Sequence, residues 1–182
     1  GLNNGRTPDY NANGVGTVGS DLNTSSNLTE SVHGVILEIK GNITEAGGAR
    51  SLSKQSLDTV ILSGTNSYTG GTNIGGGTLR ITSAGGLAPG SDVRMYGPSI
   101  LDISVDDTTA ESSVPVVSAK GLISAKVSGE FVSSAGFITN SSTRVNTLRI
   151  GAAAAAGTST SFGGVIQNNL NLEKVGPHQQ VL

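Results

Sequence analysis

Residues 59–81 read Thr-Val-Ile-Leu-Ser-Gly-Thr-Asn-Ser-Tyr-Thr-Gly-Gly-Thr-Asn-Ile-Gly-Gly-Gly-Thr-Leu-Arg-Ile. Both ends of this stretch are short runs in which apolar and polar residues alternate, and a turn of Gly, Asn and Thr with one Tyr separates them. Alternation of this kind is typical of a strand with one buried face. Nothing in the stretch has helical periodicity, so it predicts strands of an all-β protein.

The same alternation recurs along the whole chain of 182 residues. Alternating apolar residues occur at Leu37 and Ile39, Val60 and Leu62, Leu79 and Ile81, Val93 and Met95, Leu101 and Ile103, and Leu170 and Leu172, with longer runs over 122–127 and 145–150. Clusters of Gly, Asn, Ser and Asp separate nearly all of these runs, as turns separate strands. The chain therefore repeats one simple unit.

The spacing of these runs indicates how the units are arranged. Three pairs of equivalent residues are 21, 22 and 22 positions apart, namely Ile39 to Val60, Ile81 to Ile103, and Ile150 to Leu172. A strand every 20 to 25 residues or so, with no helix between strands, is typical of a solenoid in which each period adds one coil. At this period the chain would form roughly eight coils, each rising about 4.8 Å.

Composition separates the solenoid from its main structural rival, a β-sandwich, which also has short strands and frequent turns. Only six residues are aromatic and none is Trp. A sandwich core about 10 Å thick usually contains bulky side chains, whereas small and branched aliphatic residues fit a narrower interior. The regular spacing and the absence of convincing Asn-Gly hairpin turns between paired strands also favour the solenoid.

Residues 50–81 resemble the autotransporter-associated β-strand repeat. The matching segments are Leu-Ser-Lys at 52–54, Thr-Val-Ile-Leu-Ser-Gly at 59–64, Asn-Ser-Tyr-Thr-Gly-Gly-Thr at 66–72 and Gly-Gly-Thr-Leu at 76–79. A weaker partial copy lies at 162–166 and 170–176, and residues 55–58 depart from the usual Gly-x-Gly. The resemblance implies a right-handed parallel β-helix in the exported part of a large bacterial surface or secreted protein. In that family the repeat is associated with scaffolding and export, not with catalysis.

Composition along the chain predicts two regions and excludes several partners. Residues 1–30 are rich in Asn, Gly, Ser and Thr and are expected to be a loop-like polar segment, with a β-solenoid domain over 31–182.

The net charge of −2 with 13% charged residues gives no basic surface for nucleic acid. No apolar run approaches the roughly 20 residues that cross a bilayer, so we expect no membrane insertion by this chain. Without Cys there is no disulfide or cysteine metal site. The start, which has neither Met nor a signal region, suggests a processed chain or a segment of a longer one.

Two patterns resemble functional motifs. The three spaced glycines of residues 14–19 fit a dinucleotide-binding pattern, but polar residues flank them where a strand and a helix would be needed, so a Gly-rich loop is expected.

The one acidic cluster of the sequence consists of Asp102, Asp106, Asp107 and Glu111. β-Helix enzymes can use such carboxylates on polysaccharides as acid, base or calcium ligands. We interpret the cluster as a solvated turn with Asp102 pointing outward.

The remaining candidates are single residues. His33 and His178 lie 145 positions apart without nucleophile or metal partners, and we expect both at the surface. Tyr68 lies in the repeat-like turn, where it is expected to pack within the fold and not to stack on a glycan. We therefore assign no catalytic, cofactor-binding or metal-binding residue, and no cofactor.

These observations predict a non-enzymatic structural or scaffold segment of a secreted or cell-surface bacterial protein, with an adhesive role toward a host or matrix glycan or protein left open. One alternative is a subunit that stacks end to end into an extracellular filament, because neither terminus looks like a cap and exposed strand edges favour self-association. Another alternative is a polysaccharide-active β-helix enzyme that uses the acidic cluster.

Overall fold

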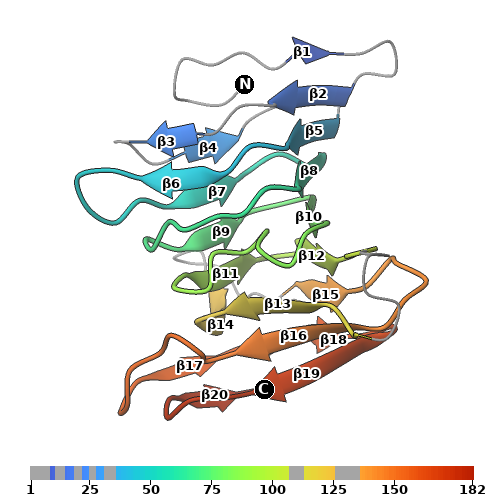
Figure 1. The fold of residues 1–182 in the computed structure, drawn as a ribbon. Helices are drawn as coiled ribbons and strands as arrows, with labels where there is room; N and C mark the ends of the chain where they lie inside the picture. Colours follow the sequence, from blue (N-terminus) through green and yellow to red (C-terminus); the bar gives the residue numbers. More distant parts are fainter. Residues whose placement is uncertain are drawn as a thin grey trace.

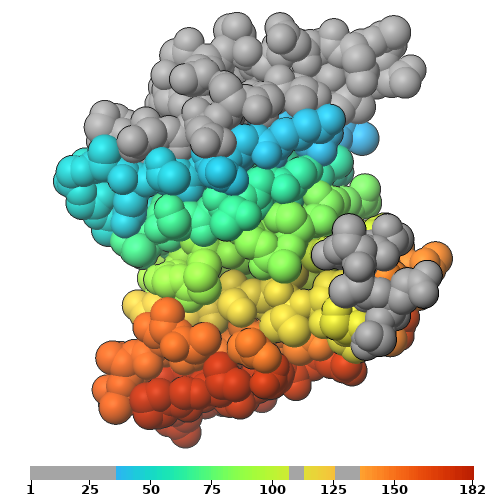
Figure 2. Space-filling view, viewed as in Figure 1, coloured from blue at the N-terminus to red at the C-terminus, as the bar shows by residue number. Residues whose placement is uncertain are grey.

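The computed structural model describes residues 36–106, 113–125 and 136–182, together with the backbone of four short strands before residue 36. Every regular element in these residues is a β-strand, and none of them is helical. The strands lie one above another from the N-terminal to the C-terminal end of the molecule (Figure 1). In the space-filling view the sequence colours follow one another as layers of the same stack (Figure 2).

The strands form two larger sheets and three smaller ones. The eight-stranded sheet contains, in order, β1 (Asp9–Tyr10), β2 (Val15–Val18), β5 (Ile36–Ile39), β8 (Thr59–Leu62), β10 (Thr78–Ile81), β12 (Ile100–Ile103), β15 (Phe137–Thr139) and β18 (Val165–Ile166). The five-stranded sheet contains β4 (Leu28–Glu30), β7 (Leu52–Lys54), β9 (Thr72–Ile74), β11 (Asp92–Tyr96) and β14 (Gly121–Ala125). The smaller sheets are β13 (Val116–Ala119) with β16 (Asn146–Ile150) and β19 (Leu170–Lys174), β3 (Leu22–Thr24) with β6 (Ile43–Glu45), and β17 (Ser159–Ser161) with β20 (Gln179–Val181).

Strand pairing is parallel throughout the described part of the chain, except for the antiparallel pair β1 and β2. This confirms an all-β chain of stacked parallel strands, the arrangement of a β-solenoid, and not the antiparallel layers of a sandwich. Each strand contributes one rung to a sheet, and the rungs lie about 4.8 Å apart.

The core is a set of aliphatic columns that run along the stack. In the eight-stranded sheet one column contains Leu37, Val60, Leu79, Leu101 and Ile138, which are paired rung by rung. Each of these side chains is at most 2% exposed. Successive residues of a strand point to opposite faces, so the residues next to each inward residue along its strand point out of the stack. The thin aliphatic interior expected from composition is confirmed.

The register agrees with the sequence spacing in one place and differs by two residues in others. Ile81 pairs with Ile103, as its spacing predicted. Ile39, however, pairs with Leu62 and not with Val60, and the third expected pair is displaced by two residues in the same way. A shift of two keeps each side chain on the same face, so alternation alone cannot distinguish these registers.

The N-terminal segment contains more strand than its composition predicted. Four short strands occur within residues 1–30, where a loop was expected. β2, β3 and β4 pair in parallel with β5, β6 and β7. The glycine-rich pattern at 14–19 contains strand β2 itself, so the expected loop is wrong for Val15–Val18. Backbone pairing to an existing strand edge does not require an apolar sequence, which explains why composition missed these strands. The division of the chain at residue 30 stays a prediction.

Two polar residues of the repeat-like turn make buried hydrogen bonds, Asn66 to the neighbouring coils and Tyr68 within its own coil. Asn66 Oδ1 accepts the backbone N–H of Ile43 at 2.8 Å, and its Nδ2 donates to the Gly86 carbonyl at 2.7 Å. Tyr68 is 1% exposed, and its hydroxyl lies 2.7 Å from Thr72 Oγ1. Burial raises the pKa of Tyr68 to about 12. The packing role predicted for this tyrosine is confirmed.

The same repeat contains a buried lysine that sequence reasoning did not single out. Lys54 occupies an inward position of β7 and is 1% exposed. Its Nζ donates to the carbonyl oxygen of Ser56 at 2.6 Å and lies 3.0 Å from Ser56 Oγ. These contacts solvate the ammonium group inside the aliphatic stack, where an isolated charge would be costly.

Gly70 of the same repeat has a steric role, because a Cβ atom there would lie 2.5 Å from the Arg50 carbonyl oxygen.

Candidate functional site

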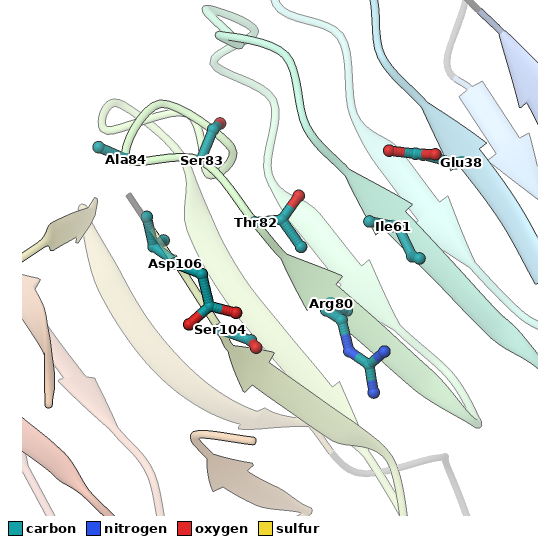
Figure 3. Close-up of a pocket in the computed structure, with 9 residues that line it drawn as sticks. Glu38, Ile61, Arg80, Thr82, Ser83, Ala84, Ser104 and Asp106 are labelled. Atoms are coloured by element: carbon teal, nitrogen blue, oxygen red, sulfur yellow. The ribbon is translucent and has the colours of Figure 1, made fainter. Parts of the chain in front are cut away.

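A groove of about 600 Å³ lies on the outer face of the eight-stranded sheet. Residues of β5, β8 and β10 and of the segments that follow β10 and β12 line it (Figure 3). Glu38, Ile61, Arg80 and Asp102 are paired on successive rungs. Each lies between two inward residues, so local alternation places this row on the outer face.

Hydroxyl groups connect the N-terminal part of the groove. Ser63 Oγ donates to Glu38 Oε1 at 2.6 Å, and Thr82 Oγ1 donates to Ser63 Oγ at 3.0 Å. Lys40 Nζ lies 3.6 Å from the other Glu38 oxygen. The Glu38 carboxylate is thus held in place at one end of the groove, and the hydroxyl groups lie in a row across the next two rungs.

The ion pair between Arg80 and Asp102 lies at the centre of the outer face. Arg80 Nε donates to Asp102 Oδ2 at 2.8 Å. Asp102 also accepts the backbone N–H of Ser141 at 2.9 Å and the Ser141 hydroxyl at 2.6 Å. It is only 2% exposed. The solvated position expected for Asp102 is wrong: its side chain does point outward, but Arg80 and the segment after β15 cover it.

The structure brings together only part of the predicted acidic cluster. Asp106 is exposed and accepts a hydrogen bond from Ser142 Oγ, next to the serine that binds Asp102. Asp107 and Glu111 lie outside the described residues. Among the residues that are described, no group of three or more His, Cys, Asp or Glu side chains is placed to hold a metal ion. Because three protein hydrogen bonds already engage Asp102, it is poorly placed to exchange protons with a substrate.

One of the two histidines differs from its predicted position. His178 is 4% exposed and lies in the last described coil, with Nε2 3.4 Å from Thr160 Oγ1. A Cβ atom at Gly151, whose φ is +99°, would lie 2.7 Å from His178 Nδ1, so the glycine makes room for the ring. The surface prediction is therefore wrong for His178, because the coil before it covers the ring. His33 lies outside the described residues.

The groove offers hydrogen-bonding groups but no recognisable catalytic machinery among its described residues. Arg80 presents the outer part of its guanidinium group, and Glu38 and Asp106 present carboxylates at either side. Arg80 and Glu38 lie two rungs apart, which corresponds to about 10 Å along the stack. The described residues that line the groove include no histidine or lysine that could activate a hydroxyl group. The arrangement is suited to holding a polar ligand.

No stretch of the described chain forms a helix with the length and apolar character of a membrane span.

Comparison with known proteins agrees with the motif in the first part of the stack. The family model of the passenger-associated transport repeat matches residues 52–81, which run from the start of β7 to the end of β10. This chain carries the repeat of the autotransporter passenger family. The resemblance noted from residues 50–81 is thereby confirmed.

A curated relative gives the wider context. The chain is 35% identical to the adhesin BmaC autotransporter of Brucella suis biovar 1 (strain 1330) in an alignment of 113 residues that covers 59% of this chain. It spans 3% of the length of that relative. No solved structure matches the chain. The repeat and the relative indicate a secreted or cell-surface bacterial protein.

Proposed function

We propose that the chain is a non-catalytic structural segment of an exported passenger protein, built as a right-handed β-solenoid of roughly eight coils. The observation that carries this proposal is the column of in-register aliphatic residues that continues from β5 to β15 without interruption. Such a column gives a stiff stack whose outer faces are free to vary in sequence.

The mechanism of this segment is mechanical. Parallel backbone hydrogen bonds join each coil to the next along the stack, and the aliphatic columns exclude water from the interior. Side chains such as Asn66 add further bonds to the coils on both sides. Each coil buries its apolar face against its neighbours, so the coils stabilise one another and hold the outer surface at a fixed distance from its attachment point.

An adhesive role is the second part of the proposal. The relative is described as an adhesin, and the polar groove on the eight-stranded sheet has the donors and acceptors that binding of a polar ligand requires. The bound partner is then a glycan or a protein of the host or of the surrounding matrix.

Two experiments test the proposed function. Antibodies against the purified chain should label intact cells of the source bacterium, and protease added outside should remove the label. Labelling that appears only after lysis would contradict the proposal. Incubation of the chain with a panel of plant and bacterial polysaccharides should release no reducing ends. Release that the Asp106→Asn substitution abolishes would support the enzyme instead.

A further inference from the structure

A second hollow lies on a different face of the stack. It has a volume of about 350 Å³ and is lined by Ser53, Gln55, Asn73, Gly75 and Tyr96. These residues belong to β7, β9 and β11 of the five-stranded sheet or directly follow these strands. No lining residue is charged, in contrast to the groove on the eight-stranded sheet.

The register explains why a hollow forms here. Lys54, Ile74 and Met95 are paired on successive rungs and point into the core. The next residue of each strand, Gln55, Gly75 and Tyr96, therefore points outward on the same three rungs. Glycine occupies the middle rung, so the amide of Gln55 and the ring of Tyr96 have no side chain between them. The backbones of Gln55 and Tyr96 are two rungs, or about 10 Å, apart along the stack.

The glycine is needed for this arrangement. A Cβ atom at Gly75 would lie 2.5 Å from Gln55 Oε1, so the glutamine amide lies directly over the glycine. On the neighbouring outward row, Asn73 Nδ2 donates to Ser53 Oγ at 3.3 Å. Two amide groups and one hydroxyl group thus lie together beside the aromatic ring.

Tyr96 is partly exposed, as is Phe137 among the other aromatic residues that the structure describes. Tyr68 and Phe162, by contrast, are each 1% exposed. No hydrogen bond among the described residues involves the Tyr96 hydroxyl group. An aromatic ring that lies beside amide groups in a hollow provides an apolar surface and polar groups at one place, as ligand-binding pockets do.

We propose that this hollow binds one residue of a neutral saccharide. A pyranose ring has an apolar C–H face, which would pack on Tyr96, and a rim of hydroxyl groups. Each hydroxyl both donates and accepts, and the amides of Gln55 and Asn73 offer both functions as well. The hollow lies within the size range of small-ligand pockets, which begins at about 300 Å³. This inference deepens the adhesive part of the proposed function and depends on it.

The charges nearby favour a neutral sugar over an acidic one. The nearest cation on the same outward row is Arg94, which is paired on its rung with Asn73. Arg94 Nη2 lies 3.4 Å from Asp92 Oδ2, which Lys120 Nζ also approaches to 3.9 Å, so the carboxylate balances part of this positive charge. None of the residues that line the hollow is a cation that would pair with a sugar carboxylate, and the carboxylate would lose hydration on binding.

The test uses the three tyrosines of the chain, Tyr10, Tyr68 and Tyr96, as separate probes. The protein is labelled with ¹³C-tyrosine, and the ring signals are assigned with single Tyr→Phe variants. It is then titrated with the methyl glycosides of glucose, galactose, mannose and N-acetylglucosamine. We expect at least one of these to shift the Tyr96 ring signals in a saturable way while the buried Tyr68 signals stay in place.

Variants define the site. Tyr96→Ala should weaken binding at least about tenfold, whereas Tyr96→Phe keeps the ring and should retain most of the affinity. Gly75→Val fills the hollow at a residue whose backbone is not left-handed, and it should abolish binding. Val165→Thr, at an exposed position of β18 that lines neither hollow, is the control and should change nothing. Far-UV circular dichroism confirms that each variant is folded.

Each contrary result overturns the inference in a distinct way. Absence of a saturable shift with all four glycosides rules out the saccharide while leaving the scaffold role, which cell labelling tests separately. Saturation that persists in Gly75→Val places binding elsewhere. Equal or tighter binding of methyl glucuronide contradicts the preference for a neutral sugar.

Discussion

The hydrogen bond between Tyr68 and Thr72 allows a quantitative test of how the repeat stabilises the stack. Both residues are at most 1% exposed, and their hydroxyl oxygens are 2.7 Å apart. Tyr68→Phe leaves the Thr72 hydroxyl buried without its phenol partner, and Thr72→Val leaves the phenol buried without its hydroxyl partner. A buried polar group that loses its partner costs about 1–3 kcal/mol, so each single variant should lose that much free energy of unfolding.

The double variant separates the bond from the packing around it. Tyr68→Phe with Thr72→Val removes both polar groups at nearly constant shape, so it should cost much less than the sum of the single variants. The resulting coupling energy should be about 1–2 kcal/mol. Tyr68→Ala removes the whole ring and should cost more, about 3–5 kcal/mol, because a cavity then remains in the core.

The pH dependence of the free energy of unfolding provides a second test of the Tyr68 hydroxyl group. The pKa of Tyr68 is raised to about 12 by burial, against about 10 in an unfolded chain. The folded state therefore keeps a proton that the unfolded state loses. The stability is fully present below pH 10 and is lost as the pH rises from about 10 to 12, by about 2–3 kcal/mol if nothing else titrates. This loss should be absent in Tyr68→Phe.

Urea unfolding followed by far-UV circular dichroism at pH 7 and pH 11 measures all four variants and the parent protein. The reasoning is wrong if both single variants are as stable as the parent. It is also wrong if the double variant costs the full sum, since that would mean that the two hydroxyl groups do not interact. Equal alkaline sensitivity of the parent and of Tyr68→Phe would assign the pH effect to other groups.

Three further predictions concern polar groups between coils. Asn66→Ala removes two buried hydrogen bonds and should cost about 2–4 kcal/mol in urea unfolding; a change below 0.5 kcal/mol or so would contradict the proposed link between coils. Asp102→Ala leaves Arg80 without its carboxylate and should cost about 2–3 kcal/mol, whereas Asp102→Asn should cost less. The backbone N–H of Thr69 is the main cause that lowers the pKa of Glu45, so Glu45→Gln should lose stability at pH 7, with the difference fading as the pH falls below about 4.5; a constant difference down to pH 2 would refute this.

Local alternation made the inward residues predictable without any structure. Leu37, Leu79 and Leu101 could be placed inside the stack because the side-chain period of two is a property of the strand itself. The absence of helices between strands, with a period near 22 residues, likewise predicted stacked coils. The packing of Tyr68 was accessible only because its turn resembles a known repeat.

The register and the burial of polar groups could not be read in the same way. A shift of two residues leaves every side chain on its face, so Ile39 could be given the wrong partner. Asp102 and His178 look like surface residues in their local sequence. They are buried because Ser141 and Gly151, which lie 39 and 27 positions away, pass over them.

The candidate saccharide site also depends partly on features that the sequence predicts and partly on features that only the tertiary structure determines. By itself the sequence established which residues alternate and therefore which face each would occupy, because that depends on nearest neighbours along the strand. Only the tertiary structure brought Gln55, Gly75 and Tyr96 onto adjacent rungs. Gln55 and Tyr96 are 41 residues apart in the sequence, and they lie near each other because of the register in which three coils stack. Contacts between coils determine that register, and the sequence of a single coil does not.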